Sequence, residues 1–429
     1  MFELVKTELS KIPDVVDVEI TPLMTTTRLS EKDRQTGFSL VGEKGYLIWI
    51  TRKDKIHLNF FRSEIGLLDE NVPEFKKTVE RTISELHTTH SKNSLNFSGG
   101  PGVLPESVLK HLAASLLEEP ELKYSILGVS HRTDWFKKLI QETKETIYRM
   151  SHLDREEYEI LFLQGGSSLQ FVMAPLNIKA YLAKQNVKGG YLDTGYWGRK
   201  AFEEGQKVCE ASLVKTEEDL EKFDFIHYVS NETVDGTQFD APNVRGPLVV
   251  CDASSDFLTR SCPKVDIIYA HAQKNLGPAG VTIIVVKKSL LAHSSTLPGI
   301  LSYKDHSKAD SILNTPPVFG IYALRLVLGW AFSTLGDVDA IERFCLKRAK
   351  ILRDTLSASK NFKLEGNSPI NIIFTSRNDK QFLAYCESKG IFGLEGHRSK
   401  GGLRASLYLG LPTSSVELLS KCITDFDKL

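Results

Sequence analysis

From residue 94 onward, short apolar runs alternate with polar loops and helical segments, and this alternation constrains the fold more than any other feature of the sequence. Five strand-like runs, each followed by a polar turn, occupy residues 158–163, 189–193, 223–229, 246–252 and 265–270. Strands that alternate with helices predict an α/β fold with a mainly parallel sheet between helices. In such sheets ligands bind beyond the carboxyl ends of the strands, where the unusual polar residues of this chain fall.

The chain of 429 residues is predicted to have three parts. Residues 1–93 are an accessory α+β extension that carries no chemical motif. Residues 94–335 hold the strand–helix alternation and form the predicted large domain, and residues 336–429 form a smaller α/β domain. Outside the alternating region we expect strands over 45–50, 55–61, 371–374 and 403–409, and helices over 73–87, 338–358 and 379–389.

Charge and cysteine content exclude several classes of function. Lys plus Arg and Asp plus Glu number 54 each, so the net charge gives no reason to expect nucleic acid or an anionic membrane as a partner. The six cysteines form no CxxC pair, which argues against a zinc site, and so few of them suit a reducing compartment. Neither a secretory signal nor a bilayer-spanning run is found. We therefore expect a cytoplasmic protein without a metal.

Lys274 lies in a polar turn between the apolar runs 265–270 and 281–286. Partial desolvation there lowers the pKa of a lysine amine and makes it a candidate Schiff-base nucleophile, although a lone turn lysine is more often simply solvated. Asp252 ends the preceding strand-like run, where it is either an N-cap or a buried anion. A buried carboxylate there suits pyridoxal phosphate, because it keeps the ring nitrogen protonated and the ring acts as an electron sink. Both groups can reach one ring.

Other motifs fit a flat phosphorylated cofactor without requiring one. Residues 165–168, Gly-Gly-Ser-Ser, open an apolar helix whose free N–H groups favour a phosphate, although many such turns bind nothing. Trp197 offers a stacking face or ordinary packing at the rim. Thr233 offers a hydrogen bond to a ring hydroxyl or is a plain turn residue. Asn314 and Thr315 precede two prolines and offer further donors in what is otherwise only a loop.

Together these segments resemble the phosphoserine aminotransferases, a family of class V, fold type I pyridoxal-phosphate enzymes. The most specific are AQKNLGPAG, NTPP, SHR and GHRSKGGLRAS, and all occur in the family's order between about 94 and 429. The matching segments are NFSGGPGVLPESVL (96–109), VSHRTDWF (129–136), FLQGGSSLQF (162–171), TGYWGRKA (194–201), SNETVDGT (230–237), CDASSDFLTR (251–260), YAHAQKNLGPAGVTIIVV (269–286), LNTPPVFGIY (313–322) and LEGHRSKGGLRASLY (394–408). The resemblance implies a fold type I transferase with a seven-stranded sheet, and a homodimer with shared active sites.

The resemblance also implies a role for each matching cofactor residue. Lys274 would hold the cofactor and move a proton at the substrate carbon, and Asp252 would pair with the ring nitrogen. Trp197 would stack on the ring, with Thr233 near the ring hydroxyl. The residues implied for the phosphate are Ser167, Ser168 and Gln273, with Asn314 and Thr315 from the neighbouring subunit.

The implied substrate residues are cationic. Arg404 would bind the α-carboxylate of the substrate. The residues implied for the substrate phosphate, or for the distal carboxylate of glutamate, are His397 and Arg398, with His131 and Arg132 from the partner chain. Guanidinium groups bind carboxylates and phosphates through two parallel hydrogen bonds. Each of these side chains alone is more simply a surface ion-pair residue; it is the group, in two matching motifs, that favours binding.

The implied reaction is reversible amino transfer between O-phospho-L-serine and 2-oxoglutarate, giving 3-phosphooxypyruvate and L-glutamate in serine biosynthesis. Use of a phosphorylated hydroxythreonine in pyridoxine biosynthesis stays open. The chain departs from the family pattern at Gly99, where serine or alanine is common, at Ser168, where some members have arginine, and over 365–374, which lacks an expected Arg-Met-Asn run. Two alternatives are a class V aminotransferase for a non-phosphorylated substrate, of the alanine–glyoxylate type, and a non-catalytic relative whose extension binds a partner.

Overall fold

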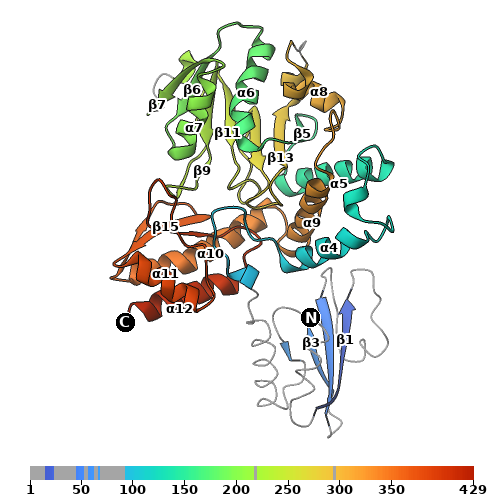
Figure 1. Cartoon of the computed structure of the whole chain (residues 1–429), viewed down its shortest axis with the longest axis vertical. Coiled ribbons are helices and arrows are strands. Elements are labelled where there is room, and N and C mark those ends of the chain that lie inside the picture. Colours follow the sequence, from blue (N-terminus) through green and yellow to red (C-terminus); the bar gives the residue numbers. More distant parts are fainter. Residues whose placement is uncertain are drawn as a thin grey trace. The chain divides into compact units, whose positions relative to one another are not determined.

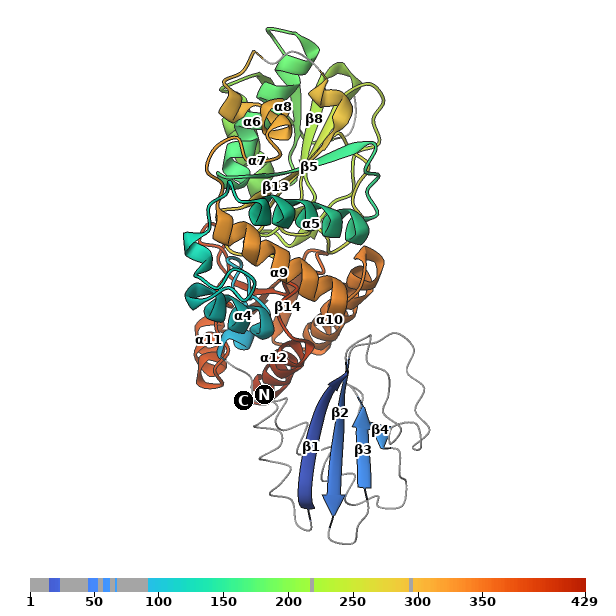
Figure 2. The same ribbon diagram turned by 90° about the vertical axis from the view of Figure 1, so that its right-hand side faces the viewer.

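The computed structural model describes residues 92–216, 220–292 and 296–429 and, before them, the backbone of four strands. By its internal contacts the chain divides into two compact units, Met1–His90 and Ser91–Leu429. The described strands of the first unit form an antiparallel sheet, seen in Figure 2, in the order β1 (Val15–Leu23), β2 (Gly45–Arg52), β3 (His57–Phe61) and β4 (Gly66–Leu67).

The strands predicted over 45–50 and 55–61 are confirmed by β2 and β3. The strand β1 escapes the prediction because Pro22 interrupts its alternating pattern; an edge strand tolerates proline, and β1 is at the edge of its sheet. The predicted helix over 73–87 lies outside the described residues.

The second unit is built on a seven-stranded sheet in the order β5-β13-β12-β11-β8-β6-β7. Its strands are β5 (Tyr158–Leu163), β6 (Lys188–Leu192), β7 (Glu210–Val214), β8 (Phe225–Val229), β11 (Leu248–Asp252), β12 (Ile267–His271) and β13 (Thr282–Lys287). Neighbouring strands from β12 to β7 are parallel, and β13 is antiparallel to both β12 and β5. The predicted mainly parallel α/β sheet is therefore confirmed.

The five predicted strand runs all form strands, with ends displaced by no more than a few residues. The strand β13 reverses direction because the turn between β12 and β13 is too short to hold the crossover helix that a parallel connection needs. The strand β7 was not among the predicted strands; its sequence, EASLV, is only partly buried at the sheet edge.

Alternation of side chains along each strand gives the sheet two apolar faces. Ile160 and Phe162 of β5 belong to one core cluster, and Leu161 and Leu163 belong to the other. The first face is covered by α4 (Glu106–Leu117), α5 (Asp134–Ser151) and α9 (Val318–Thr334), and the second by α6 (Gly166–Leu182), α7 (Tyr196–Gly205) and α8 (Tyr303–Lys308), as Figure 1 shows. This is the three-layer arrangement expected of a sheet with helices on both sides.

The C-terminal segment packs three helices against a small antiparallel sheet. The elements are α10 (Val338–Ala358), β14 (Phe362–Glu365), β15 (Asn371–Ser376), α11 (Asp379–Ser388), β16 (Leu403–Ser406) and α12 (Thr413–Phe426), with the sheet order β14-β15-β16. The elements predicted in this segment are confirmed, although β16 is shorter than the run 403–409. The division at residue 335 stays a prediction, since the segment belongs to the same compact unit as the large sheet.

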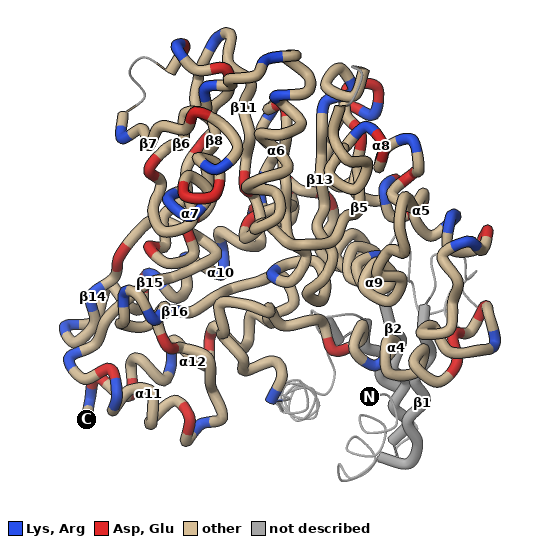
Figure 3. The backbone as a smooth tube through the Cα atoms, turned by 45° about the horizontal axis from the view of Figure 1, so that its top comes forward, with Lys and Arg blue, Asp and Glu red and all other residues tan. Residues whose placement is uncertain are grey.

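Charges of both signs are interspersed along the described part of the second unit, as Figure 3 shows. Among the described residues, no single helix has the length and apolar composition to cross a membrane; α9 and α10 meet that test only as a pair, and the two are bent by 81°.

The carboxyl end of β8 lies next to the C-terminal segment, because Asn231, two residues past β8, donates to Asn371 of β15. Just past β8, the short strands β9 (Asn231–Glu232) and β10 (Thr237–Gln238) pair with each other and contact that segment. The carboxyl edge of the large sheet and the C-terminal segment thus enclose the region that the sequence marks as functional.

Candidate active site

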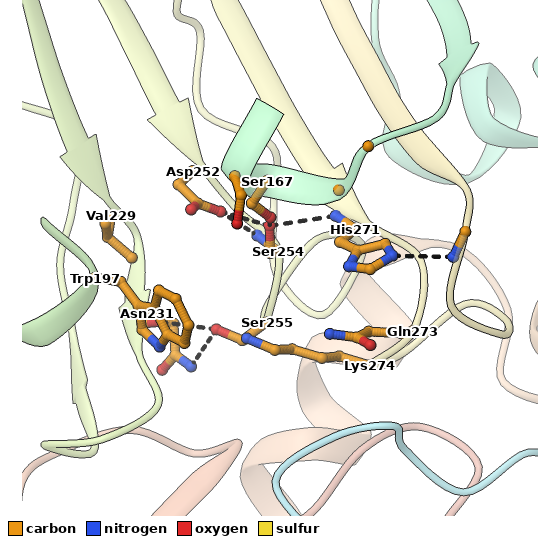
Figure 4. Close-up of a pocket in the computed structure, with 14 residues that line it drawn as sticks. Ser167, Trp197, Val229, Asn231, Asp252, Ser254, Ser255, His271, Gln273 and Lys274 are labelled. Carbon is orange, nitrogen blue, oxygen red and sulfur yellow. Dashed lines mark hydrogen bonds between the residues drawn. The ribbon is translucent and has the colours of Figure 1, made fainter. Parts of the chain in front are cut away.

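A cavity of about 380 Å³ lies at the carboxyl ends of the central strands. It is drawn in Figure 4. Six of the predicted site residues line it: Ser167, Ser168, Trp197, Asp252, Gln273 and Lys274. The sequence predicted that Lys274 and Asp252 face one space, and the structure brings them together there.

Lys274 is half-buried in the turn after β12, and its Nζ lies 5.9 Å from the centre of the Trp197 ring. Burial lowers the pKa of its amine, the nearby Asp252 carboxylate opposes that shift, and Arg404 adds to it. Its backbone is fixed by a close approach, because a Cβ at Gly102 would lie 2.1 Å from the carbonyl oxygen of Lys274. The lysine therefore combines a fixed main chain with an amine that gives up its proton readily.

Asp252 ends β11 and is only 4% exposed. Its Oδ1 accepts hydrogen bonds from the backbone N–H of Ser254 at 3.0 Å and from its hydroxyl at 2.6 Å. Burial raises the pKa of Asp252, while the two Ser254 hydrogen bonds and Lys274 favour the anion. The side chain is buried, and it caps no helix because the residues after it, 253–260, form turns.

Ser254 joins this carboxylate to the turn at the start of α6. Because its hydroxyl donates to Asp252, it accepts from Ser167 Oγ, which lies 2.6 Å away. Ser254 belongs to the matching segment at 251–260, but no role was predicted for it. The signal was present, since an aspartate commonly accepts from the residue two positions later.

The turn at residues 165–168 has the geometry of an anion cradle. Gly165 and Gly166 have φ of 95° and 65°, which glycine adopts without strain. The helix α6 begins at Gly166, and the first N–H groups of a helix lack partners within it. Ser167 and Ser168 add two hydroxyls at the same place. The turn therefore fits a phosphate through neutral donors and the helix dipole.

Trp197 is held by two hydrogen bonds. Its indole Nε1 donates to Thr233 Oγ1 at 3.0 Å, and its backbone N–H donates to Glu232 Oε2 at 3.0 Å. Oε1 of Glu232 also accepts from the backbone N–H of Gly198 at 2.8 Å and from Thr194 Oγ1 at 3.0 Å. Glu232 is fully buried, and burial raises its pKa against these hydrogen bonds. This acid, to which the sequence assigned no role, anchors the tryptophan and the start of α7.

Thr233 does not line the cavity itself; it contacts Trp197, which does line it, and Arg404, which does not. Nη1 of Arg404 donates to the carbonyl oxygen of Thr233 at 3.1 Å, and within the described residues its buried Nε has no partner. A Cβ at Gly99 would lie 2.0 Å from Arg404 Nη2. The departure at Gly99 therefore has a local explanation, because the guanidinium occupies the space that a side chain there would take.

A buried polar network ties the cavity to the C-terminal segment. Asn231 lines the cavity and donates to Asn371 Oδ1 at 2.8 Å, and Asn371 donates to Ser406 Oγ at 3.0 Å. Ser368 Oγ donates to Asn231 Oδ1 at 2.6 Å. The stretch 365–374, which departs from the family pattern, thus still supplies cavity-supporting contacts, and these fix β16 and its Arg404.

His397 and Arg398 lie in the loop before β16. The His397 ring centre is 4.9 Å from that of Tyr196, next to Trp197 in sequence. Burial lowers the pKa of His397, and Arg404 and Arg398 lower it further. Arg398 is exposed. Neither residue is among the described residues that line the cavity.

Four predicted residues stand apart from the cavity of their own chain. His131 is half-buried and Arg132 exposed in the loop before α5, and Asn314 and Thr315 are exposed before α9. The carbonyl oxygen of Thr315 accepts from Gln164 Nε2 at 2.7 Å, so that loop lies against the residue before the cradle. None of the four lines the cavity among the described residues.

Observed geometry fits pyridoxal phosphate, the cofactor implied by the resemblance. The cavity offers a buried carboxylate for a ring nitrogen, an aromatic face, a cradle for a phosphate, and a lysine of lowered pKa for an aldehyde. Each of these four groups is a different chemical requirement of the same molecule.

Comparisons with known proteins agree with this cofactor, because all the matches below are aminotransferases. The family described as Aminotransferase class-V matches residues 94–419. A phosphoserine aminotransferase of Bacillus cereus is 37% identical over 357 residues, covering 77% of this chain and 98% of that protein. The solved structure of phosphoserine aminotransferase from Bacillus circulans subsp. alkalophilus superposes with a TM-score of 0.74 at 32% identity, covering 79% of this chain and 99% of that one. The pyridoxal-phosphate-bound phosphoserine aminotransferase from Trichomonas vaginalis gives a TM-score of 0.70 at 28% identity, covering 77% and 99%.

Proposed function

The chain belongs to the class V aminotransferases and, among them, to the phosphoserine aminotransferases, and from this premise we propose how its residues transfer an amino group between O-phospho-L-serine and 2-oxoglutarate. The products are 3-phosphooxypyruvate and L-glutamate. Pyridoxal phosphate, when bound, supplies an aromatic system that accepts the electron pair left when the substrate Cα loses its proton. The observation that carries the proposal is that Lys274 and Asp252 line one cavity with Arg404 beside it.

Lys274 acts as nucleophile and then as base. Its lowered pKa leaves more of the amine neutral, which favours attack on an aldehyde carbon. With substrate and cofactor bound, Nζ of Lys274 would be the base that takes the proton from the substrate Cα, and it would hold that proton for its return. Asp252 keeps a proton on the ring nitrogen, since an ionised carboxylate in a buried site stabilises a neighbouring cation. Trp197 covers the ring and excludes water from that face.

The cationic residues select a doubly anionic amino acid. Arg404 binds the α-carboxylate, and its unpartnered Nε and its Nη2, close to Gly99, are the donors left for that purpose. The residues proposed to bind the phosphate are His397 and Arg398, with His131 and Arg132 from a second copy. Ser167, Ser168 and Gln273 bind the cofactor phosphate, with Asn314 and Thr315 from the second copy.

A homodimer with shared active sites is part of this proposal. It is supported by the placement of His131, Arg132, Asn314 and Thr315, which lie outside their own cavity although each belongs to a matching motif. Mixing two inactive variants, Lys274→Ala and Arg132→Ala, tests it: subunit exchange into a shared-site dimer restores part of the activity, whereas independent sites restore none.

The reaction is tested with a coupled transamination assay. We expect turnover with phosphoserine and 2-oxoglutarate, and at most a few per cent of that rate with serine. Equal rates with serine or with alanine and glyoxylate would favour the non-phosphorylated alternative. A visible absorbance band of the purified protein that persists in Lys274→Ala would contradict the role of the lysine, and absence of any band in the wild type would favour the non-catalytic alternative.

The proposal extends to a cytoplasmic location, to serine biosynthesis and to phosphohydroxythreonine of pyridoxine biosynthesis as a second substrate. Cell fractionation and an assay with 4-phosphohydroxythreonine test these parts. For residues 1–93 we propose either a partner-binding module or a structural cap on the dimer. Comparing activity and oligomeric mass of the full chain with those of residues 91–429 separates the two, and unchanged values would contradict both.

A further inference from the structure

We propose that His271 is an additional ligand of the cofactor phosphate, to which it donates a hydrogen bond from Nδ1. This inference rests on the proposed function, because it assumes a phosphorylated cofactor in the cavity. His271 ends β12, three residues before Lys274, and it lines the same cavity. His271 belongs to the matching segment at 269–286, but no role was predicted for it from the sequence.

The hydrogen bond made by the other ring nitrogen fixes the tautomer. The backbone N–H of Gly280 donates to Nε2 of His271 at 3.2 Å. A neutral imidazole has one acceptor and one donor nitrogen, so Nδ1 carries the hydrogen when Nε2 accepts. Burial and the nearby Lys274 lower the pKa of His271, which keeps the ring neutral. Among the described residues no protein atom accepts a hydrogen bond from Nδ1, and because this nitrogen is not one of the buried polar atoms without a partner, it is open to the cavity and available to a ligand.

The ring lies against the start of the phosphate cradle. A Cβ at Gly166, the first residue of α6, would lie 3.3 Å from Nδ1 and 3.4 Å from Cε1. In Figure 4 one ring nitrogen of His271 faces Gly280, and the other faces the cavity on the side of Ser254 and Gln273. An anion held by the free N–H groups at the start of α6 therefore lies within reach of the Nδ1 hydrogen.

Charge in the cavity explains the use of a neutral donor. Among the described residues that line it, Lys274 is the cation and no arginine is present. A second fixed cation near the amine would depress the pKa of Lys274 further, whereas a neutral imidazole adds a hydrogen bond to the phosphate without adding charge. Nδ1 of a neutral His271 would therefore add one more uncharged donor to the serine hydroxyls and backbone N–H groups at the start of α6.

A simpler role for His271 is to support the turn at Gly280 through Nε2. Two substitutions separate this role from phosphate binding, because each retains one of the two ring positions. In His271→Asn the amide nitrogen takes the place of Nδ1 and still donates to the cavity. In His271→Gln the amide oxygen takes the place of Nε2 and still accepts from Gly280, while nothing donates at the Nδ1 position.

The measurement is the dissociation constant of the full-length protein, freed of cofactor, for pyridoxal phosphate and for pyridoxal, which lacks the phosphate. We expect His271→Gln to weaken binding of pyridoxal phosphate about ten- to a hundredfold, as for a lost hydrogen bond to a charged group. Binding of pyridoxal should be unchanged in the same variant, and His271→Asn should bind both within about threefold of wild type.

Inorganic phosphate gives a second readout that does not depend on either variant alone. It should strengthen pyridoxal binding by the wild type and by His271→Asn more than by His271→Gln. The proposal is overturned if His271→Gln weakens both ligands equally, or if His271→Asn is the weaker binder of pyridoxal phosphate. If the wild type itself shows no preference for pyridoxal phosphate over pyridoxal, the proposed cofactor site fails rather than this refinement of it.

Discussion

Replacing Glu232 with glutamine should loosen Trp197 and the start of α7 while leaving the shape of the side chain unchanged. Two of the three hydrogen bonds to this carboxylate reach Oε1, from Gly198 and Thr194, and an amide oxygen there keeps them. The third runs from the Trp197 N–H to Oε2 at 3.0 Å, and an amide nitrogen in that position places a donor against a donor. The substitution therefore removes one hydrogen bond, and it removes it at Trp197, the residue proposed to cover the cofactor.

The expected loss in the free energy of unfolding follows from these contacts. A hydrogen bond to a charged group contributes about 1.5–3 kcal/mol, and a negative charge at a helix N-terminus about 0.3–1 kcal/mol. Burial of the carboxylate, which raises its pKa, offsets part of this sum because an amide is more easily desolvated. We expect Glu232→Gln to lower the free energy of unfolding by about 2–3 kcal/mol and to weaken pyridoxal phosphate binding as well.

The assay is urea unfolding of the cofactor-free protein, followed by titration with pyridoxal phosphate. Glu203→Gln is the matched control, since Glu203 lies on α7, the helix whose start Glu232 holds, but pairs with Lys200 at the surface. Such pairs contribute little, so the control should behave as wild type. If Glu232→Gln and Glu203→Gln unfold at the same urea concentration and bind the cofactor equally well, Glu232 does not organise this side of the cavity.

Three further predictions follow from the site and its core. Gly99→Ala should displace the Arg404 guanidinium and raise KM for phosphoserine and glutamate about fivefold or more, as for a weakened bidentate pair, with cofactor affinity retained; an unchanged KM would contradict it. The rate at which the cofactor-free protein captures pyridoxal phosphate should rise with pH to a midpoint below 10.5, because burial lowers the pKa of Lys274 and the neutral amine is the nucleophile; a midpoint at 10.5 or above would refute this. Burial lowers the pKa of His227 from 6.5 to about 3, so the unfolded chain takes up a proton at this residue before the folded protein does. The free energy of unfolding should therefore fall by about 4–5 kcal/mol between pH 6.5 and pH 3. Urea unfolding of His227→Phe should lack this part of the pH dependence.

The sequence predicted elements well where one signal decided them. The strand at 158–163 and the helix at 338–358 match β5 and α10 in full, because a short apolar run bounded by polar turns and a long amphipathic helix are both clear signals. The direction of β13 could be predicted only from the length of the turn before it, because its own residues do not distinguish a parallel from an antiparallel strand. The strand β1 could be predicted only by knowing that it lies at a sheet edge, and its position there is known only from the pairing of the other strands.

Site residues divide in a similar way. Lys274, Asp252 and Trp197 could be proposed from chemistry and the ends of strands, since the carboxyl ends of parallel strands meet at one edge. Glu232 and His271 could not, because their roles depend on which side-chain atom meets which backbone N–H, across 35 residues for Glu232 and nine for His271. Ser254 stands between these cases, since its distance of two residues from Asp252 was visible but its contact with Ser167 was not.

The one reversed strand of the large sheet has a spatial consequence for ligand size. Adjacent strands lie about 4.8 Å apart, so the tips of β5 and β12, which flank β13, are separated by roughly 10 Å. Between them β13 presents its beginning rather than its tip, and the residue two positions before it is Gly280, which has no side chain to fill the interval. If β13 ran parallel to its neighbours, a loop leading into a helix would follow its tip at this edge. That loop would occupy the space between β5 and β12, and less room would be left there for the phosphate of a cofactor.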